Sequence, residues 1–354
     1  MRVLIIGMGY AGTRYWQAFT ALSPELGPIE IAHASRSPNS SPVPGYTSIA
    51  HALDNFVPDL VVVTVNDVNR ADVLRELVSY RGTIVCEKPL ITSSDSIAEV
   101  ETAFGDRDSF YVAQIERYSQ AARDLKLFAR TGNARAVRGS FFWAKNRIGD
   151  PRPTSGVISE IIHPIDLLQW ILSDGRETME KTVGTIIRSD FSISGDSVID
   201  TALATGTIAG TPVAGYSSFV GLERMRSIQL TLSDGSPSPI YATATFDSPV
   251  WDADQLRVWR LTDRGLQDEL ITRDYAPDTD AANPGLRKQI RLCRDLIEHV
   301  RNPSHQPDLP QIGEALDMQR VLNALASGAG PTTQYFGNSE RFRLAADASS
   351  EVLG

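Results

Sequence analysis

Cysteine is nearly absent from this sequence of 354 residues. Its two cysteines, Cys86 and Cys293, lie far apart, and neither has a second cysteine or a histidine at metal-ligand spacing. A disulfide framework and a zinc site are therefore not indicated, and we expect no metal ion. Such sparse use of cysteine favours a reducing, cytoplasmic location.

Long apolar runs and clustered basic residues are also lacking. No stretch of 18 apolar residues occurs, so no membrane-spanning segment is expected. The apolar run near the N-terminus has strand length and is too short for a signal peptide. The net charge is -9, with 34 basic and 43 acidic residues and no basic run, which argues against a nucleic-acid partner.

The composition itself is that of an ordinary globular protein, with 42% hydrophobic and 22% charged residues. Single cores stop growing at about 250 residues, so a chain of this length is expected to form two domains. We predict a first domain over 1–118 and a second, α+β domain over 119–330. The tail over 331–354 is assigned no role.

The first domain alternates between strand-like and helix-like segments. Residues 60–65 read LVVVTV, an uninterrupted run typical of a strand buried on both faces. The other expected strands are 2–6, 29–35, 83–86 and 110–113, and the expected helices are 12–22, 70–79 and 94–104. This alternation predicts an α/β Rossmann fold with a doubly wound parallel sheet.

The second domain has a different rhythm. Several short alternating segments within residues 183–275 are separated by Gly, Ser and Pro. They indicate an open, mostly antiparallel sheet in an α+β domain. Helices are expected over 119–130, 157–172, 286–301 and 312–326, and a strand over 136–143.

A G-x-G-x-x-G motif lies between the first strand and the first helix. It comprises Gly7, Gly9 and Gly12, with Tyr10 and Ala11 before the last glycine. The first glycine permits a tight turn, the second lets a pyrophosphate approach the backbone, and the third allows close packing of helix on strand. The motif predicts a dinucleotide site at the helix N-terminus. The alternative is a purely structural glycine turn.

The end of the second strand bears on cofactor choice. It reads Ala34-Ser35-Arg36, without the acidic residue that would hold the ribose 2′-hydroxyl of NAD. A hydroxyl and a guanidinium suit a 2′-phosphate, so Ser35 and Arg36 favour NADP(H). If Arg36 is only a solvated loop charge, NAD(H) remains possible.

A second motif, Cys86-Glu87-Lys88-Pro89, follows the strand over 83–86. Ligands of parallel α/β sheets bind outside the carboxyl ends of the strands, so Lys88 should point towards the nicotinamide. There it would hydrogen-bond the reacting oxygen and stabilise charge on it. The alternative is a plain turn after a strand.

The glycine motif, LVVVTV followed by Asn66, and Glu87-Lys88-Pro89 together resemble the Gfo/Idh/MocA family of oxidoreductases. The resemblance is strong over 1–175 and weak in the two C-terminal helices, and no motif matches in the middle of the sheet region. It implies hydride transfer at a carbinol or ketone carbon of a sugar, cyclitol or nucleotide-linked sugar. It also implies cofactor contacts from Asn66 and Glu87, and a homodimer or homotetramer joined through the open sheet.

Residues 156–170 resemble the glycine-led helix of that family, in which an Asp and a His face the substrate. His163 matches the histidine that acts as acid or base. Ser159 stands where the familiar pattern has Asp, and Glu160, three residues before the histidine, is the proposed substitute.

The same segment can be interpreted without the family. Glu160, His163 and Asp166 recur at helical spacing on one face, and a histidine flanked by carboxylates suits a proton relay. The alternative is a polar surface stripe on an amphipathic helix. Pro164 is expected to strain or restart the helix.

Two further sets of residues are weaker candidates for substrate binding. Arg117 and Tyr118 resemble the family's junction segment, which lines the substrate cleft; the alternative is a hinge helix cap. Lys145, Arg147 and Arg152 precede the 157–172 helix and suit an anionic substrate. The alternative there is a solvated basic loop.

These features together predict an NADP(H)-dependent oxidoreductase. Lys88 polarises the substrate oxygen and His163 relays its proton, with Glu160 and Asp166 as further catalytic candidates. Two alternatives remain. One is a reductase of imines or other non-sugar carbonyls, and the other is a dinucleotide-sensing regulator without turnover.

Overall fold

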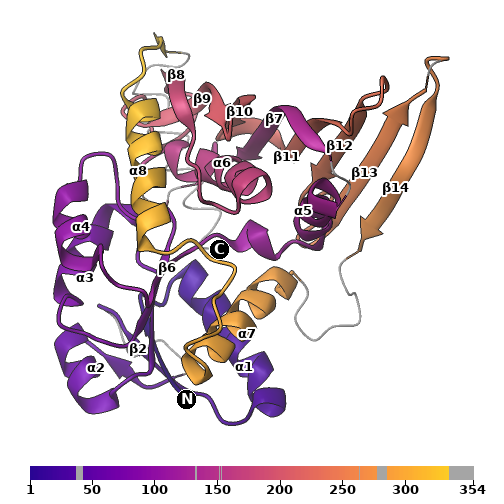
Figure 1. Ribbon diagram of the computed structural model, residues 1–354. Helices are drawn as coiled ribbons and strands as arrows, with labels where there is room; N and C mark the ends of the chain where they lie inside the picture. The colour runs from indigo at the N-terminus through magenta and orange to yellow at the C-terminus, as the bar shows by residue number, and fades with distance from the viewer. Residues whose placement is uncertain are drawn as a thin grey trace. The chain divides into compact units, whose positions relative to one another are not determined.

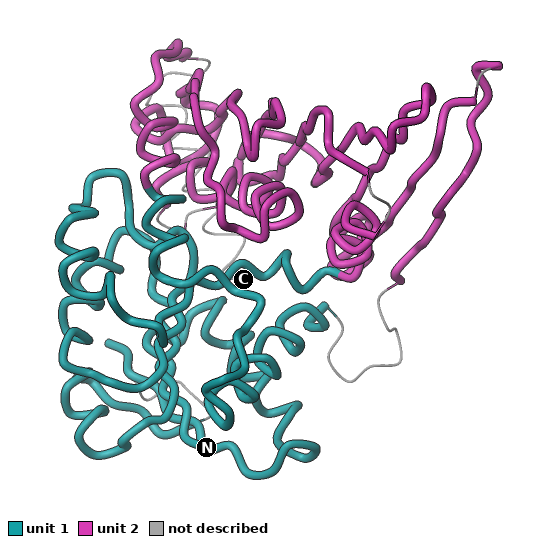
Figure 2. The backbone as a smooth tube through the Cα atoms, in the orientation of Figure 1, with its two compact units in different colours: residues 1–119, 277–319 teal, residues 120–276, 320–354 magenta. Residues whose placement is uncertain are grey.

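The computed structural model describes residues 1–36, 43–131, 134–150, 152, 154–262, 264–276 and 285–334. Figure 2 shows that the chain forms two compact units. Unit 1 comprises 1–119 and 277–319, and unit 2 comprises 120–276 and 320–354. The first boundary lies one residue after the predicted one.

Unit 1 contains the predicted Rossmann sheet, with six parallel strands in the order β3-β2-β1-β4-β5-β6. The strands are β1 (Arg2–Ile6), β2 (Glu30–Ala34), β3 (Gly45–Tyr46), β4 (Leu60–Val63), β5 (Thr83–Glu87) and β6 (Phe110–Ala113). The strand order reverses between β1 and β4, and this switch point is where doubly wound sheets bind their ligands. The prediction of a doubly wound α/β domain is confirmed.

Helices cover both faces of this sheet, as Figure 1 shows. They are α1 (Tyr10–Leu26), α2 (Ile49–Phe56), α3 (Arg70–Glu76), α4 (Ile97–Phe104) and α7 (Arg287–Arg301), with short 3-10 turns η2 (Asp67–Asn69) and η3 (Ile115–Tyr118). Val61 and Val63 of β4 pack towards α2, α3 and α4, whereas Leu60 and Val62 pack towards α1 and α7. The β4 strand is therefore buried on both faces, as its continuous apolar run predicts.

Local hydrogen bonds explain where two helices begin. Ser48 and Ser96 cap α2 and α4, each accepting a bond from the backbone N–H three residues on. The α4 helix was expected to begin at Ser94, but the hydroxyl of Ser94 bonds Thr92 at 2.8 Å within a preceding turn. Helix α2 and the two-residue strand β3 are not among the predicted elements.

The described residues 285–319 lie in unit 1, although the predicted second domain covered 119–330. Helix α7 explains this difference, because its Leu292 and Leu296 join the same apolar cluster as Phe19 of α1. Burying that apolar stripe is what places the helix on the Rossmann sheet. The pattern over 286–301 indicates a helix correctly but does not indicate which sheet receives it.

Unit 2 is built on a nine-stranded sheet in the order β14-β13-β12-β11-β7-β10-β9-β8-β15. The strands are β7 (Arg135–Asn146), β8 (Glu180–Ser189), β9 (Ile199–Ile208), β10 (Thr211–Ser218), β11 (Val220–Ser233), β12 (Ile240–Thr245), β13 (Asp254–Leu261), β14 (Gln267–Tyr275) and β15 (Thr332–Thr333). Two pairs, β7 with β10 and β8 with β15, are parallel, and the other pairs are antiparallel. The expected mostly antiparallel sheet is confirmed.

Helices α5 (Gln120–Thr131) and α6 (Ile158–Ser173) pack on one face of this sheet. Every residue of α6 from Ile158 to Ile171 is buried, so the helix does not present a polar stripe to solvent. The helix is also continuous through Pro164 and does not restart there. Proline cannot donate to the carbonyl of Glu160, four residues earlier, and the packing around the buried helix compensates for that lost bond.

Helix α8 (Ile312–Ala326) begins in unit 1 and ends in unit 2. Ile312 and Leu316 join the apolar cluster beneath α2, α3 and α4. In the second unit, Leu325 packs closely against Gly184 of β8. No helix in the described part of the chain is long and apolar enough to span a membrane.

Candidate functional site

The turn between β1 and α1 depends on Gly7. Its φ of +96° is a left-handed conformation, and a Cβ there would lie 2.9 Å from Val65. The amide of Gly7 donates to the carbonyl of Ala34 at 2.9 Å, and the Thr64 hydroxyl donates to the carbonyl of Ile6 at 3.1 Å. The turn is thereby held to both strands that flank β1.

Gly12 is closely packed, whereas Gly9 borders open space. A Cβ on Gly12 would lie 2.2 Å from the Gly7 carbonyl oxygen, so only glycine allows α1 to approach the turn this closely. A Cβ on Gly9, the N-cap residue of α1, would meet nothing within 4 Å. The first turn of α1 carries no acidic residue that would satisfy its amides. Open space at a helix N-terminus fits an anion such as a pyrophosphate.

The remaining residues of the turn and the end of β2 are accessible. Tyr10 is exposed, Ala11 is half-buried, and Arg36 is exposed two residues after β2. The Ser35 hydroxyl is buried and has no hydrogen-bond partner among the described residues, while its amide donates to the Tyr46 carbonyl at 3.0 Å. A hydroxyl and a guanidinium at this strand end fit the ribose and 2′-phosphate of a dinucleotide.

Asn66 and Lys88 follow the neighbouring strands β4 and β5. Asn66 is half-buried, and its side chain caps η2 by accepting from the amide of Asn69 at 3.1 Å. Lys88 is also half-buried and precedes Pro89 across a cis peptide bond. Parallel strands end at the same edge of the sheet, so both residues lie at the carboxyl edge, as predicted.

Glu87 precedes Lys88 at the end of β5. Burial raises the pKa of its carboxyl above the ordinary value of 4.5, while the charges of Lys88 and Arg70 act in the opposite direction. The Tyr15 phenol of α1 is buried beside this carboxyl, and burial raises its pKa as well. No motif in the sequence marks Tyr15, but it lies three residues after Gly12, on the first turns of a helix expected to face the cofactor.

Arg117 and Tyr118 are buried within unit 1. Arg117 forms an ion pair with Glu314 at 3.4 Å, and the Tyr118 hydroxyl donates to Asp295 at 2.5 Å. Tyr118 is only 1% exposed. Their substrate-binding roles stay predictions, and the contacts seen in unit 1 give both residues a structural use.

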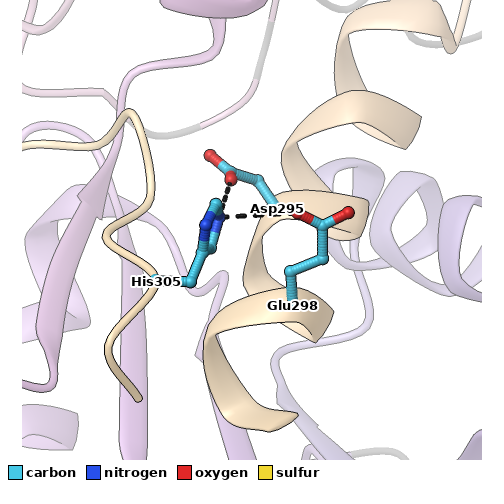
Figure 3. A group of neighbouring side chains, drawn as sticks. All are labelled: Asp295, Glu298 and His305. Atoms are coloured by element: carbon cyan, nitrogen blue, oxygen red, sulfur yellow. Dashed lines mark hydrogen bonds and ion pairs between the residues drawn. The ribbon is translucent and has the colours of Figure 1, made fainter. Parts of the chain in front are cut away.

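Figure 3 shows a group of possible metal ligands in unit 1, comprising Asp295, Glu298 and His305. The Nε2 atom of His305 lies 2.5 Å from one oxygen of Asp295, and the other oxygen accepts from the amide of Asp308 and from Tyr118. These bonds attach the segment after α7 to that helix. They explain the cluster without an ion.

Glu160 in unit 2 is held by two cations. One carboxylate oxygen accepts from Arg226 at 2.8 Å and from the indole N–H of Trp143 at 3.3 Å, and the other accepts from Lys145 at 2.5 Å. Arg226 also pairs with Asp247 at 2.7 Å. The carboxylate is buried in a hydrogen-bonded charge network, which favours its ionised form.

His163 lies on the same helix, and its ring stacks on the indole of Trp143 with centroids 5.8 Å apart. It is 5% exposed, and its Nδ1 atom is buried. Asp166, one turn on, is also buried. Ser159, at the position of the familiar Asp, donates to the carbonyl of Gly156 at 2.8 Å. The structure thus brings Glu160 and His163 together through Trp143, a residue that the sequence analysis did not select.

The basic loop before α6 carries its own counter-charge. Arg147 pairs with Asp150 at 2.9 Å, and Arg152 pairs with the same carboxylate. Burial acts to raise the pKa of Asp150, but hydrogen bonds from Arg152 and the charge of Arg147 outweigh it, so the pKa lies below its usual range. The loop is therefore less cationic than its sequence suggests.

Residues 1–113 match the family model described as oxidoreductase family, NAD-binding Rossmann fold, for Gfo/Idh/MocA proteins. The Rossmann domain belongs to the Gfo/Idh/MocA oxidoreductase family. This confirms the resemblance inferred from the glycine turn and the Glu87-Lys88-Pro89 segment. No curated protein matches the chain in sequence.

Solved structures are similar to this chain over nearly its whole length. Levoglucosan dehydrogenase in complex with NADH and levoglucosan has a TM-score of 0.74 at 15% identity, covering 93% of this chain and 97% of that one. Myo-inositol 2-dehydrogenase from Lactobacillus plantarum has a TM-score of 0.66 at 14% identity, covering 93% and 97%. The transcriptional regulator Gal80p from Kluyveromyces lactis has 0.71 at 14% identity, covering 92% and 91%. At these identities the likeness establishes the two-domain fold.

The two glycines give a matched pair of substitutions. Gly12→Ala should destabilise the fold by about 1–3 kcal/mol, because its methyl would overlap the Gly7 carbonyl. Gly9→Ala should change stability by less than about 0.5 kcal/mol, since its φ of -82° suits alanine and the space is open. It should still weaken the binding of NAD(P)H about tenfold or more, because the added methyl fills the open space at the helix N-terminus. Urea unfolding and calorimetry measure the two effects, and equal stability of the two variants would contradict this account of the turn.

Proposed function

We propose that this protein is an NADP(H)-dependent oxidoreductase that acts on a carbonyl or hydroxyl carbon of a sugar, cyclitol or nucleotide-linked sugar. The observation that carries the proposal is the open N-terminus of α1 above Gly9, at the switch point of the sheet. Lys88 stands at the same carboxyl edge, after β5. A dinucleotide bound along that edge would place its reactive end near this lysine.

The cofactor would be held by the residues around the turn. Gly7, Gly9 and Gly12 leave room for the pyrophosphate, and the amides of α1 face it. Ser35 and Arg36 would bind the 2′-phosphate, and Asn66 and Glu87 the nicotinamide half. A bound nicotinamide supplies or accepts a hydride in such reactions.

The chain's own groups would manage charge and protons. The Lys88 ammonium would donate a hydrogen bond to the reacting oxygen and stabilise negative charge on it. His163 would relay the proton of that oxygen, with Asp166 as a further candidate in the relay. We assign Glu160 a positioning role, because its carboxylate is already held by Arg226, Lys145 and Trp143.

Polyhydroxylated substrates are favoured by two kinds of support. Structures similar to this chain include a levoglucosan dehydrogenase and a myo-inositol 2-dehydrogenase. Lys145 and Arg147 both lie near the ring of Phe219, which gives unit 2 polar groups suited to hydroxyls or a phosphate. The departure at Ser159 leaves an imine or another non-sugar carbonyl as the alternative substrate. We further propose a cytoplasmic location.

A regulator without turnover is the second candidate function. The similarity to Gal80p favours it, because that transcriptional regulator shares the fold at a TM-score of 0.71. The presence of both Lys88 and His163 in this chain favours the enzyme. Binding of a dinucleotide without turnover of any substrate would support the regulator.

A self-associating surface is the proposed partner site. The face of the unit 2 sheet opposite α5 and α6 carries Phe142, Tyr216 and Leu203, which lie in register on three adjacent strands. The rings of Phe142 and Tyr216 stack with centroids 4.8 Å apart, and Leu203 is 43% exposed. A broad apolar sheet face suits contact with a second copy of the chain, and we propose a homodimer or homotetramer.

Leu203→Lys should dissociate this oligomer, since it places a charge at the centre of the apolar face. Leu127→Lys is the matched control, because Leu127 on α5 is 60% exposed and lies outside that face. Light scattering should give a mass near the 38.7 kDa of one chain only for the first variant. A monomeric wild-type protein would contradict the proposal.

Cofactor preference can be tested at Arg36. The wild-type chain should bind NADPH more tightly than NADH, and Arg36→Ala should weaken NADPH binding about 10- to 100-fold by removing charge-assisted bonds to the 2′-phosphate. Its affinity for NADH should change less than about threefold. Calorimetric titration measures both constants, and equal losses for the two cofactors would remove Arg36 from the 2′ site.

Turnover can be tested at Lys88. Lys88→Met should lower kcat about 100-fold or more and leave NADPH affinity nearly unchanged, because only charge on the reacting oxygen is affected. Lys181→Met, at an exposed site on β8, is the control. NADPH oxidation should be followed with keto-sugars, nucleotide-linked keto-sugars, inosose and cyclic imines. Full activity of Lys88→Met would rule out this mechanism, and turnover of imines alone would select the alternative substrate class.

A further inference from the structure

One buried side chain joins the ends of β4 and β5. Arg70, the first residue of α3, donates from one terminal nitrogen to the carbonyl of Val65 at 2.8 Å and from the other to the carbonyl of Pro89. Val65 lies two residues after β4, and Pro89 lies two residues after β5. The two bonds therefore tie neighbouring strand ends to a single planar group.

The charge of Arg70 is unusual in its surroundings. The side chain is buried, and no carboxylate lies within ion-pair distance of it among the described residues. The Glu87 carboxyl interacts with this charge from beyond ion-pair distance. The two backbone carbonyls accept hydrogen bonds from the guanidinium directly, and such bonds reduce the cost of burying it. The charge of Arg70 also acts on Cys86. Burial raises the pKa of the Cys86 thiol to about 12, and the charge of Arg70 acts to lower that pKa.

The two carbonyls belong to residues adjacent to the predicted site. Val65 directly precedes Asn66, and Pro89 directly follows Lys88. A guanidinium has a rigid fork of donors, which holds two acceptors at a defined separation. A lysine ammonium at the same place has no such fork and would not hold both acceptors in the same geometry.

We propose that Arg70 is a positioning residue for Lys88. Its guanidinium acts as a strut between the backbone at Val65 and the backbone at Pro89, and so determines where the Lys88 ammonium stands at the edge of the sheet. This proposal rests on the proposed function. The residue touches neither substrate nor cofactor, and it acts through the backbone that carries Lys88.

The test compares Arg70→Met and Arg70→Lys with Arg75→Met. Arg75 lies on the same helix, where it is exposed and pairs with Asp72 and Glu99, so its replacement is a matched control. Arg70→Met should lower kcat about 10- to 100-fold, since small misplacements of a catalytic group are costly. KM and the NADPH dissociation constant should change less than about threefold. Arg70→Lys should fall between wild type and Arg70→Met, and the control should match wild type.

Hydrogen exchange of the free protein gives a readout that needs no turnover. The backbone amides of Leu90 and Ile91 should exchange faster in Arg70→Met, because the carbonyl of Pro89 loses its hydrogen bond from Arg70. Their exchange rates should be unchanged in Arg75→Met. If Arg70→Met does not fold, Arg70→Lys carries the same measurements.

Two results would overturn the proposal that Arg70 positions Lys88. One is a folded Arg70→Met with kcat within twofold of wild type, and the other is unchanged exchange at Leu90 and Ile91. A wild-type chain that binds neither NADPH nor NADH would instead overturn the proposed function, and the exchange measurement would still decide whether the strut exists.

Discussion

The close approach of α1 to the turn at Gly7 is the contact on which unit 1 depends. The missing side chain of Gly12 lets the helix begin directly against the Gly7 carbonyl, which points its first amides at the switch point of the sheet. The ends of β2, β4 and β5 meet that same edge and bring Ser35, Asn66 and Lys88 to it. A single steric condition thus brings the N-terminus of α1 and these three side chains to one edge of the sheet.

Buried charge has the corresponding role in unit 2. Glu160 is enclosed by Arg226 and Lys145, and its remaining bond orients the indole of Trp143 against His163. A carboxylate that is paired in this way costs much to protonate or remove. The network thereby fixes the indole of Trp143 against the ring of His163.

The sequence predicted those parts of the structure that are determined locally. The LVVVTV run, the glycine turn and the α6 pattern each depend on periodicity or on glycine sterics, and the structure has them where expected. Residues whose roles depend on distant partners could not be read this way. The sequence alone does not distinguish Glu160 from an unpaired acid, because its partner Arg226 lies 66 residues further along the chain. Arg70 likewise has the sequence features of an ordinary first-turn residue, and only the fold shows that it donates to the carbonyl of Pro89. The destination of α7 likewise follows from the apolar face that α1 leaves open.

The position of α7 has a consequence for the order in which the protein is made. One face of the Rossmann sheet is completed by Leu292, Leu296 and Ile297, which the ribosome adds long after β6. Before α7 is synthesised, Phe19 and its apolar neighbours on α1 are partly exposed to solvent. Contacts between residues so far apart in the sequence also form slowly. A fragment ending near residue 119 would therefore expose the apolar side chains that α7 covers in the full chain.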